Sequence, residues 1–189
     1  MAPTLPERKH PVHMPNVYRQ NEPVIVFLTV CAAKRRPVLS NSEMHALLAK
    51  AWTRSSGWLV GRYMIMPDHI HLFCSPAGFD AKNVKTWAAY WKGLVSRGLR
   101  GYGPLAAAAA DGVEAVPPGQ GRGVLGGPGS TPADTDGAVW QRDVWGSQLR
   151  SGEHYHEKWE YVRMNPVRQN LIKEPELWPF QGEMNKLLW

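Results

Sequence analysis

The run from Met66 to Phe73 places two histidines, His69 and His71, on either side of the apolar Ile70. Successive side chains of a β-strand point to opposite faces, so both imidazoles would project from one face while Ile70 is buried on the other. Two imidazoles at this spacing can share one divalent metal ion. For such a pair taken alone, a strand with two exposed or internally bonded histidines is the ordinary alternative.

A second candidate site lies in a predicted helix near the C-terminal end of the chain. Tyr155, Trp159 and Val162 have the spacing of a buried helical stripe. Tyr161 lies off that stripe, four residues before the side-chain amide of Asn165. Because tyrosine can form covalent enzyme intermediates, Tyr161 is a candidate nucleophile with a candidate metal ligand beside it. A boundary tyrosine with a hydrated hydroxyl is the alternative.

Length, charge and cysteine usage limit the class of protein. The chain has 189 residues, which suits one domain, and its net charge of +6 favours a polyanionic partner, above all a nucleic acid. The two cysteines, Cys31 and Cys74, have no metal or redox spacing, which favours a reduced cytoplasmic protein. We expect no membrane association, because the sequence has neither an apolar leader nor a membrane-length apolar run.

Hydrophobic periodicity predicts the elements that must position these residues. Strands are predicted over 24–31, 58–66, 69–75 and 140–149. Helices are predicted from a capping box of Ser40 and Glu43 to about Gly57, and over 81–99. The order predicts an α+β fold: a ferredoxin-like, RRM-like β-α-β-β-α-β antiparallel sheet with an additional C-terminal helix that carries the tyrosine.

Composition divides the chain into four parts. Residues 1–21 are proline-rich and predict an extended N-terminal arm. Residues 22–180 would form the catalytic domain, and within it the low-complexity stretch 103–137 predicts a disordered insertion, because it has too few large apolar residues to form a core. Residues 181–189 would be a C-terminal tail.

Basic residues near the second helix and the tyrosine helix are candidate phosphate contacts, with an ordinary solvated surface as the alternative. The candidates are Lys82, Lys85, Lys92, Arg97 and Arg100, together with Arg150, Arg163 and Arg168.

Four motifs occur together in order: the His-Ile-His strand, Val139-Trp140-Gln141, the stretch Tyr161 to Val167, and Trp178-Pro179-Phe180. In this combination the chain resembles the HUH single-tyrosine transposases, in which U denotes a hydrophobic residue. Within them it is most similar to the REP-associated tyrosine transposases, relatives of the small insertion-sequence transposases. The chain differs in its long insertion, in Asn170 where relatives often have glycine, and in Gln181 where serine is common.

The resemblance implies a role for each matching residue. His69 and His71 would bind Mg²⁺ or Mn²⁺, Tyr161 would be the nucleophile, and Asn165 would offer a third, amide-oxygen ligand. Such enzymes cut single-stranded DNA near hairpins formed by palindromic repeats, through a 5′-phosphotyrosine intermediate, and can rejoin strands by reversal. The resemblance favours a monomer, with a homodimer that exchanges tyrosine helices as the alternative.

Three other functions stay open. A replication-initiator or relaxase-type nickase would use the same chemistry, although such sites usually have three histidines. A non-catalytic nucleic-acid-binding module would use a similar sheet, but it needs stacking aromatics on the central strands. A zinc hydrolase would need a carboxylate partner for the two histidines, and the sequence offers no clear one.

Overall fold

The computed structural model describes residues 24–101, 137–149 and 151–188. The N-terminal arm, nearly all of the insertion and Arg150 therefore lie outside the described residues. The strands are β1 (Val26–Ala32), β2 (Trp58–Ile65), β3 (His69–Pro76), β4 (Trp140–Gln148) and β5 (Gln181–Glu183). The helices are α1 (Ser42–Arg54), α2 (Val84–Leu99), α3 (Gly152–Arg163) and the short α4 (Asn165–Arg168), with 3-10 turns η1 (Ala33–Arg35) and η3 (Pro175–Leu177).

The strands form one antiparallel sheet in the order β4-β1-β3-β2-β5. The first four strands confirm the predicted ferredoxin-like α+β fold. No strand is predicted at β5, which falls at the start of the expected C-terminal tail and pairs with β2. No helix within the described ranges is long and apolar enough to cross a membrane.

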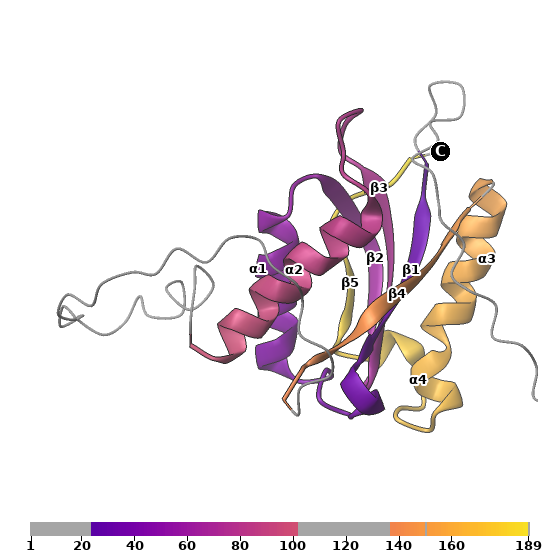
Figure 1. Cartoon of the computed structure of the whole chain (residues 1–189). Coiled ribbons are helices and arrows are strands. Elements are labelled where there is room, and N and C mark those ends of the chain that lie inside the picture. The colour runs from indigo at the N-terminus through magenta and orange to yellow at the C-terminus, as the bar shows by residue number, and fades with distance from the viewer. Residues whose placement is uncertain (1–23, 102–136, 150, 189) are drawn as a thin grey trace, which may run out of the picture.

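Helices cover both faces of the sheet (Figure 1). α1 and α2 lie against one face, where their predicted apolar stripes are buried with the alternate residues of the strands, among them Leu28, Ile70 and Leu72. Tryptophans give this core much of its bulk: the Trp91 ring contacts both Trp52 and Trp140 at edge-on angles. α3 and α4 lie against the opposite face.

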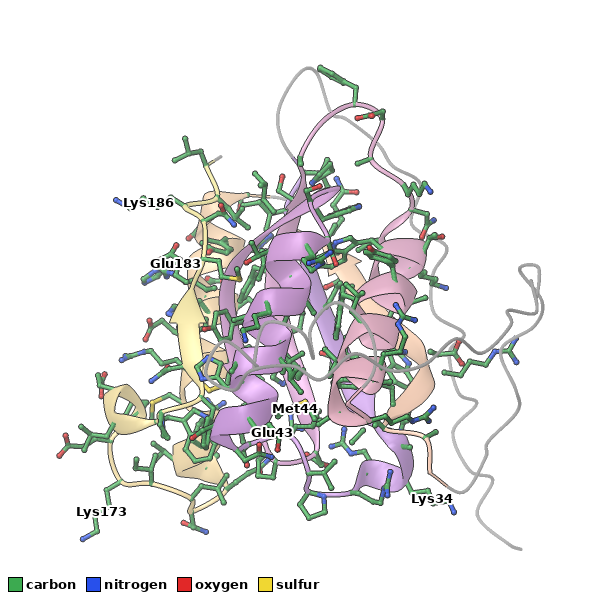
Figure 2. All side chains as sticks on the ribbon, turned by 90° about the vertical axis from the view of Figure 1, so that its left-hand side faces the viewer. Lys34, Glu43, Met44, Lys173, Glu183 and Lys186 are labelled. Atoms are coloured by element: carbon green, nitrogen blue, oxygen red, sulfur yellow. The ribbon has the colours of Figure 1, made fainter. Side chains whose placement is uncertain are left out.

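The predicted start of α1 is wrong by one residue. The N-cap is Asn41, whose side-chain oxygen accepts a hydrogen bond from the Met44 backbone N–H at 2.9 Å. Asparagine caps a helix as well as serine does, and the Asn41 backbone is extended as a cap requires. Glu43 still lies in the first turn, close to Met44 (Figure 2).

The chain after α4 returns to the edge of β2. Figure 2 shows this segment and β5 running along the side of the molecule beside α1. Gly182 passes so close to Tyr63 that a β-carbon there would lie 2.6 Å from the tyrosine hydroxyl. On the next part of the segment, Asn185 donates a side-chain hydrogen bond to the Val60 carbonyl. The C-terminal segment is therefore built into the sheet.

Candidate active site

His69 and His71 lie on the inner strand β3 and project from the face that α3 covers. The strand alternates as predicted, with Ile70 fully buried in the opposite core. The Nε2 atoms of the two imidazoles face each other at 3.1 Å. The rings meet nearly edge-on, with centroids 4.6 Å apart. The two histidines are thus aimed at a common point.

A neighbouring side chain also holds each histidine by a contact at Nδ1, its other ring nitrogen. Asp68 Oδ1 lies 2.6 Å from His69 Nδ1, and because a carboxylate can only accept, Nδ1 is the donor, so in the neutral ring Nε2 carries a lone pair. Thr29 Oγ1 lies 2.9 Å from His71 Nδ1 and can hold that ring in the same state. A partner on the second nitrogen fixes the tautomer and orientation of metal-binding histidines.

A third contact orients Asp68. The Arg35 guanidinium forms an ion pair with Asp68 at 2.7 Å and also donates to the Cys31 sulfur. Arg35 has a positive φ of 54°, as does Lys34 before it. Non-glycine residues adopt this left-handed conformation rarely, and clusters of such residues are common at functional sites.

Burial favours the neutral form of both imidazoles. Burial lowers the pKa of His69, although its hydrogen bond to Asp68 and the charge of that carboxylate oppose this effect. The pKa of His71 falls to about 3, first because of burial and then because His69 and Lys158 disfavour a further positive charge. A neutral imidazole has the free lone pair that a metal ion requires.

This geometry fits a divalent metal. Two nitrogens in adjacent positions of an octahedral ion, with bonds of about 2.1 Å, lie about 3 Å apart, close to the observed 3.1 Å. Within the described ranges, no group of three or more His, Cys, Asp or Glu side chains forms a metal site. The remaining ligands would be an amide oxygen, water or a substrate phosphate, which Mg²⁺ accepts readily.

Tyr161 lies on α3, on the same side of the sheet as the histidines. Its neighbour Val162 is buried against Met64 and Met66, and Met64 is paired with His71 across β2 and β3. Tyr161 thus comes immediately before a residue that packs on the strand partner of His71. The Tyr161 side chain is 56% exposed, so it is not a core residue.

Lys158 lies between the tyrosine and the histidines. Its Nζ is 5.2 Å from the centroid of the Phe27 ring and 5.9 Å from that of Tyr161. Phe27 in turn stacks on His71 with centroids 5.3 Å apart. A lysine in this position brings a positive charge to any phosphate bound between Tyr161 and the two histidines.

Arg168 and Asn165 follow the tyrosine in α4. The Arg168 guanidinium stacks 4.4 Å from the centroid of the Tyr161 ring, and its Nη1 donates to the Tyr161 carbonyl at 2.8 Å. These two interactions restrict the orientation of the ring. Asn165 is the first residue of α4 and is 9% exposed. Its role as a metal ligand stays a prediction.

A surface pocket of about 460 Å³ opens beside Tyr161, between the end of β4 and the exposed face of α3. The pocket is lined by Gln148, Leu149, His154, Glu157, Lys158 and Tyr161. It offers space for a ligand next to the candidate nucleophile, with hydrogen-bonding groups on both walls.

Of the predicted cations that the structure describes, Arg168 lies beside Tyr161, and the cations near α2 do not lie at this site. Lys82, Lys85, Arg97 and Arg100 are exposed in whole or in part, but they belong to the α2 side of the sheet, opposite the histidines. The interpretation of Lys92 as part of that surface is wrong, because Lys92 is buried and its Nζ donates to the carbonyls of Gln141 and Arg142.

Near the tyrosine helix, Arg163 forms ion pairs with Glu160 and Glu176. Its charge is therefore already balanced by two carboxylates of the protein. Arg150 lies outside the described residues, so its phosphate contact stays a prediction.

Sequence reasoning missed Asp68, Thr29, Arg35 and Lys158. Asp68 has the pattern of a turn residue because it follows Pro67, and its adjacency to His69 is the one available signal. Thr29 has the pattern of an ordinary strand residue, since its partnership with His71 depends on the register between β1 and β3.

The fold is that of a solved transposase. The described structure is similar to that of a REP-associated tyrosine transposase bound to a REP hairpin, with a TM-score of 0.56 at 15% identity, covering 94% of this chain and 82% of that one. A candidate transposase from Deinococcus radiodurans R1 matches with a TM-score of 0.43 at 15% identity, covering 79% of this chain and 95% of that one. No family model and no curated protein matches the chain.

Proposed function

We propose that this protein is a metal-dependent single-stranded DNA endonuclease and strand transferase of the HUH tyrosine transposase type. The observation that carries the proposal is the pair of facing Nε2 atoms of His69 and His71, 3.1 Å apart and each held from behind, next to a helix with an exposed tyrosine. The similarity in fold to a transposase bound to a REP hairpin supports hairpin-bearing DNA as the substrate.

His69 and His71 would hold Mg²⁺ or Mn²⁺, with Asn165 as a further candidate ligand. When bound, such an ion polarises the scissile phosphate and stabilises its developing charge. Lys158 would bind a non-bridging oxygen of the same phosphate, and Arg168 would keep the Tyr161 ring in position. The positive net charge of the chain would draw the DNA to the surface.

In the reaction, the Tyr161 oxygen forms a bond to phosphorus and the bond between phosphorus and the 3′ oxygen breaks. The electron pair stays on the 3′ oxygen, which takes up a proton to become a free hydroxyl, while the phenolic proton passes to solvent. The DNA fragment downstream of the cut is then held through its 5′ phosphate as a phosphotyrosine ester. Because one ester replaces another, a 3′-hydroxyl can reverse the step and join strands.

The test is covalent capture. The protein is incubated with Mn²⁺ and a pool of 3′-labelled single-stranded oligonucleotides that carry a palindromic hairpin and randomised flanks, and adducts are resolved under denaturing conditions. We expect Tyr161→Phe, which removes only the nucleophilic oxygen, to abolish the adduct while binding of the pool stays within about twofold. Tyr90→Phe, at an exposed tyrosine on α2, is the matched control.

An adduct that persists in Tyr161→Phe would refute the assignment of the nucleophile. A wild-type protein that binds the pool but forms no adduct with Mn²⁺, or with Mg²⁺ in a parallel incubation, would refute the enzymatic proposal and leave a binding module. That alternative is less well supported, because Phe73 on the central strand is covered by Tyr155 and Trp159 of α3. RNA-recognition sheets need such aromatics open for stacking.

A nickase that initiates replication would give the same adduct. The second step, in which a 3′-hydroxyl attacks the phosphotyrosine, separates the two functions. Transfer of the captured strand to a second hairpin-bearing oligonucleotide favours the transposase type. We further propose a cytoplasmic monomer.

A further inference from the structure

Trp145 is an exposed aromatic on the outer strand β4. Its side chain is 43% exposed, whereas Trp52, Trp58, Trp87, Trp91, Trp140 and Trp178 are each 8% exposed or less. Burial of apolar surface is the main favourable term in folding, so a large aromatic left half in water is a candidate for binding. Among the residues that the structure describes, no other ring stacks on it.

The register of the sheet places Trp145 on the same face as the histidines. Trp145 is directly opposite Thr29 on β1, and Thr29 is directly opposite His71 on β3. Directly opposed residues of neighbouring strands point to the same face. Trp145, Thr29 and His71 therefore form one row across the sheet, and the spacing of strands puts the first and last about 10 Å apart.

Helix α3 covers part of this face, and among the described residues its apolar side packs on β1, β2, β3 and Leu149 while Trp145 stays exposed. Its buried residues pack on Phe27, Phe73 and Met64, on strands β1, β3 and β2. The polar side of α3, with Lys158 and Tyr161, lines the pocket toward the end of β4. The row formed by Trp145, Thr29 and His71 thus has Tyr161 and Lys158 of α3 toward one end and Trp145 at the other.

We propose that Trp145 stacks on an unpaired base of the DNA strand that is cut, a few nucleotides at most from the scissile phosphate. This inference rests on the proposed function, because it takes the histidines to mark the scissile phosphate. Stacking on an aromatic ring suits a single strand, since every base has a flat face to offer. Trp145 would hold the strand across the sheet while phosphate contacts supply most of the affinity.

The experiment compares two probes with equal charge. One is fluorescein-labelled dT12, and the other is the same 12-mer of deoxyribose phosphates without bases. Binding is measured by anisotropy for wild type, Trp145→Ala and Trp145→Phe, in the Tyr161→Phe background so that no covalent product forms. Tyr90→Ala removes a comparably exposed aromatic from the α2 side of the sheet and is the control.

We expect Trp145→Ala to weaken binding of dT12 about 5- to 150-fold, the range that alanine substitution of a stacking aromatic gives. Binding of the base-free probe should stay unchanged, Trp145→Phe should keep most of the affinity for dT12, and Tyr90→Ala should behave as wild type. An unchanged dT12 affinity in Trp145→Ala would overturn the proposal. An equal loss of affinity for both probes would also overturn it, because it would mean that Trp145 does not touch a base.

The two proposals fail separately. If wild type forms the covalent adduct but Trp145→Ala binds both probes as before, the stacking inference is wrong and the endonuclease stands. If no adduct forms while Trp145→Ala selectively weakens dT12 binding, the endonuclease is wrong and the base stacking stands. Thermal unfolding of each variant within a few degrees of wild type shows that the fold is intact.

Discussion

At the scale of single residues, the two histidines differ in what holds Nδ1, the ring nitrogen that faces away from the other histidine. His69 has the Asp68 carboxylate, which Arg35 in turn orients. His71 has only the Thr29 hydroxyl, and its neighbours include the positive charge of Lys158. The His71 side is therefore the weaker half of the site, and removal of one hydroxyl should be measurable there.

Thr29→Val keeps the shape of the side chain but removes the group that holds His71 Nδ1. We expect Mn²⁺ affinity to fall at least about tenfold, as it does when a hydrogen-bond partner behind a metal-binding histidine is removed. Isothermal titration calorimetry of each protein with Mn²⁺ measures this affinity. Thr53→Val is the control, because the Thr53 hydroxyl on α1 donates to the Ala49 carbonyl. Equal affinity in Thr29→Val and wild type would show that Thr29 does not support the site.

Lys92 offers a test of stability. Burial lowers its pKa from 10.5 to about 8. Between about pH 8 and 10.5 the unfolded chain binds a proton that the folded chain has released, so this residue's contribution to the free energy of unfolding rises with pH. The neutral amine still has two N–H groups for the carbonyls of Gln141 and Arg142.

We expect urea unfolding to show wild type gaining stability over Lys92→Met as the pH rises from 8 to 10. At pH 7 the same substitution should cost about 1–3 kcal/mol if the two carbonyls are left without a donor. A stability difference between the two proteins that does not change with pH would contradict the shifted pKa.

At the scale of elements, the hydrophobic periodicity of the sequence is enough to predict a helix or strand wherever one face of that element is buried. The stripe from Met44 to Trp52 on α1 and the one from Val84 to Val95 on α2 are both buried as predicted. β5 is not predictable, because Gln181, Gly182 and Glu183 have no strand pattern and are held by pairing with β2. In the same way, His69, His71 and Tyr161 are visible in the sequence, whereas Thr29 and Lys158 need the register and the packing of α3.

The cations around α2 can be tested as a group. Replacing Lys82, Lys85, Arg97 and Arg100 with alanine should flatten the log–log salt dependence of DNA binding by about one unit for each phosphate that the variant no longer neutralises. Replacing Lys173 and Lys186, which lie on the side of β5 away from α2, should leave the slope unchanged (Figure 2). An unaltered slope in the fourfold variant would assign the α2 surface to solvent.

At the scale of the whole molecule, the insertion separates α2 from β4 in the sequence, yet these two elements pack against each other in the fold. Trp140, the first residue of β4, is packed against Trp91 and donates its indole N–H to the Lys92 carbonyl. The interactions that dock β4 on α2 thus come from residues on either side of the insertion.

We therefore expect that replacing residues 103–136 with a short glycine–serine linker leaves the fold and DNA cleavage intact. The composition of the segment, with five consecutive alanines and many glycines and prolines, offers little for a core. Circular dichroism, thermal unfolding and the adduct assay measure the result. A shortened protein that fails to unfold cooperatively would show that the segment contributes to the core.

The sheet ends in β4 on one side and β5 on the other. Outer strands expose backbone groups that can recruit a strand from another molecule, which leads to aggregation. β5 has only three residues, and β4 carries the exposed charges of Arg142 and Asp143. Short length and edge charges are two known protections against such pairing. The same outer strand that we propose presents Trp145 to a single strand of DNA is thus guarded against joining the sheet of a neighbouring copy.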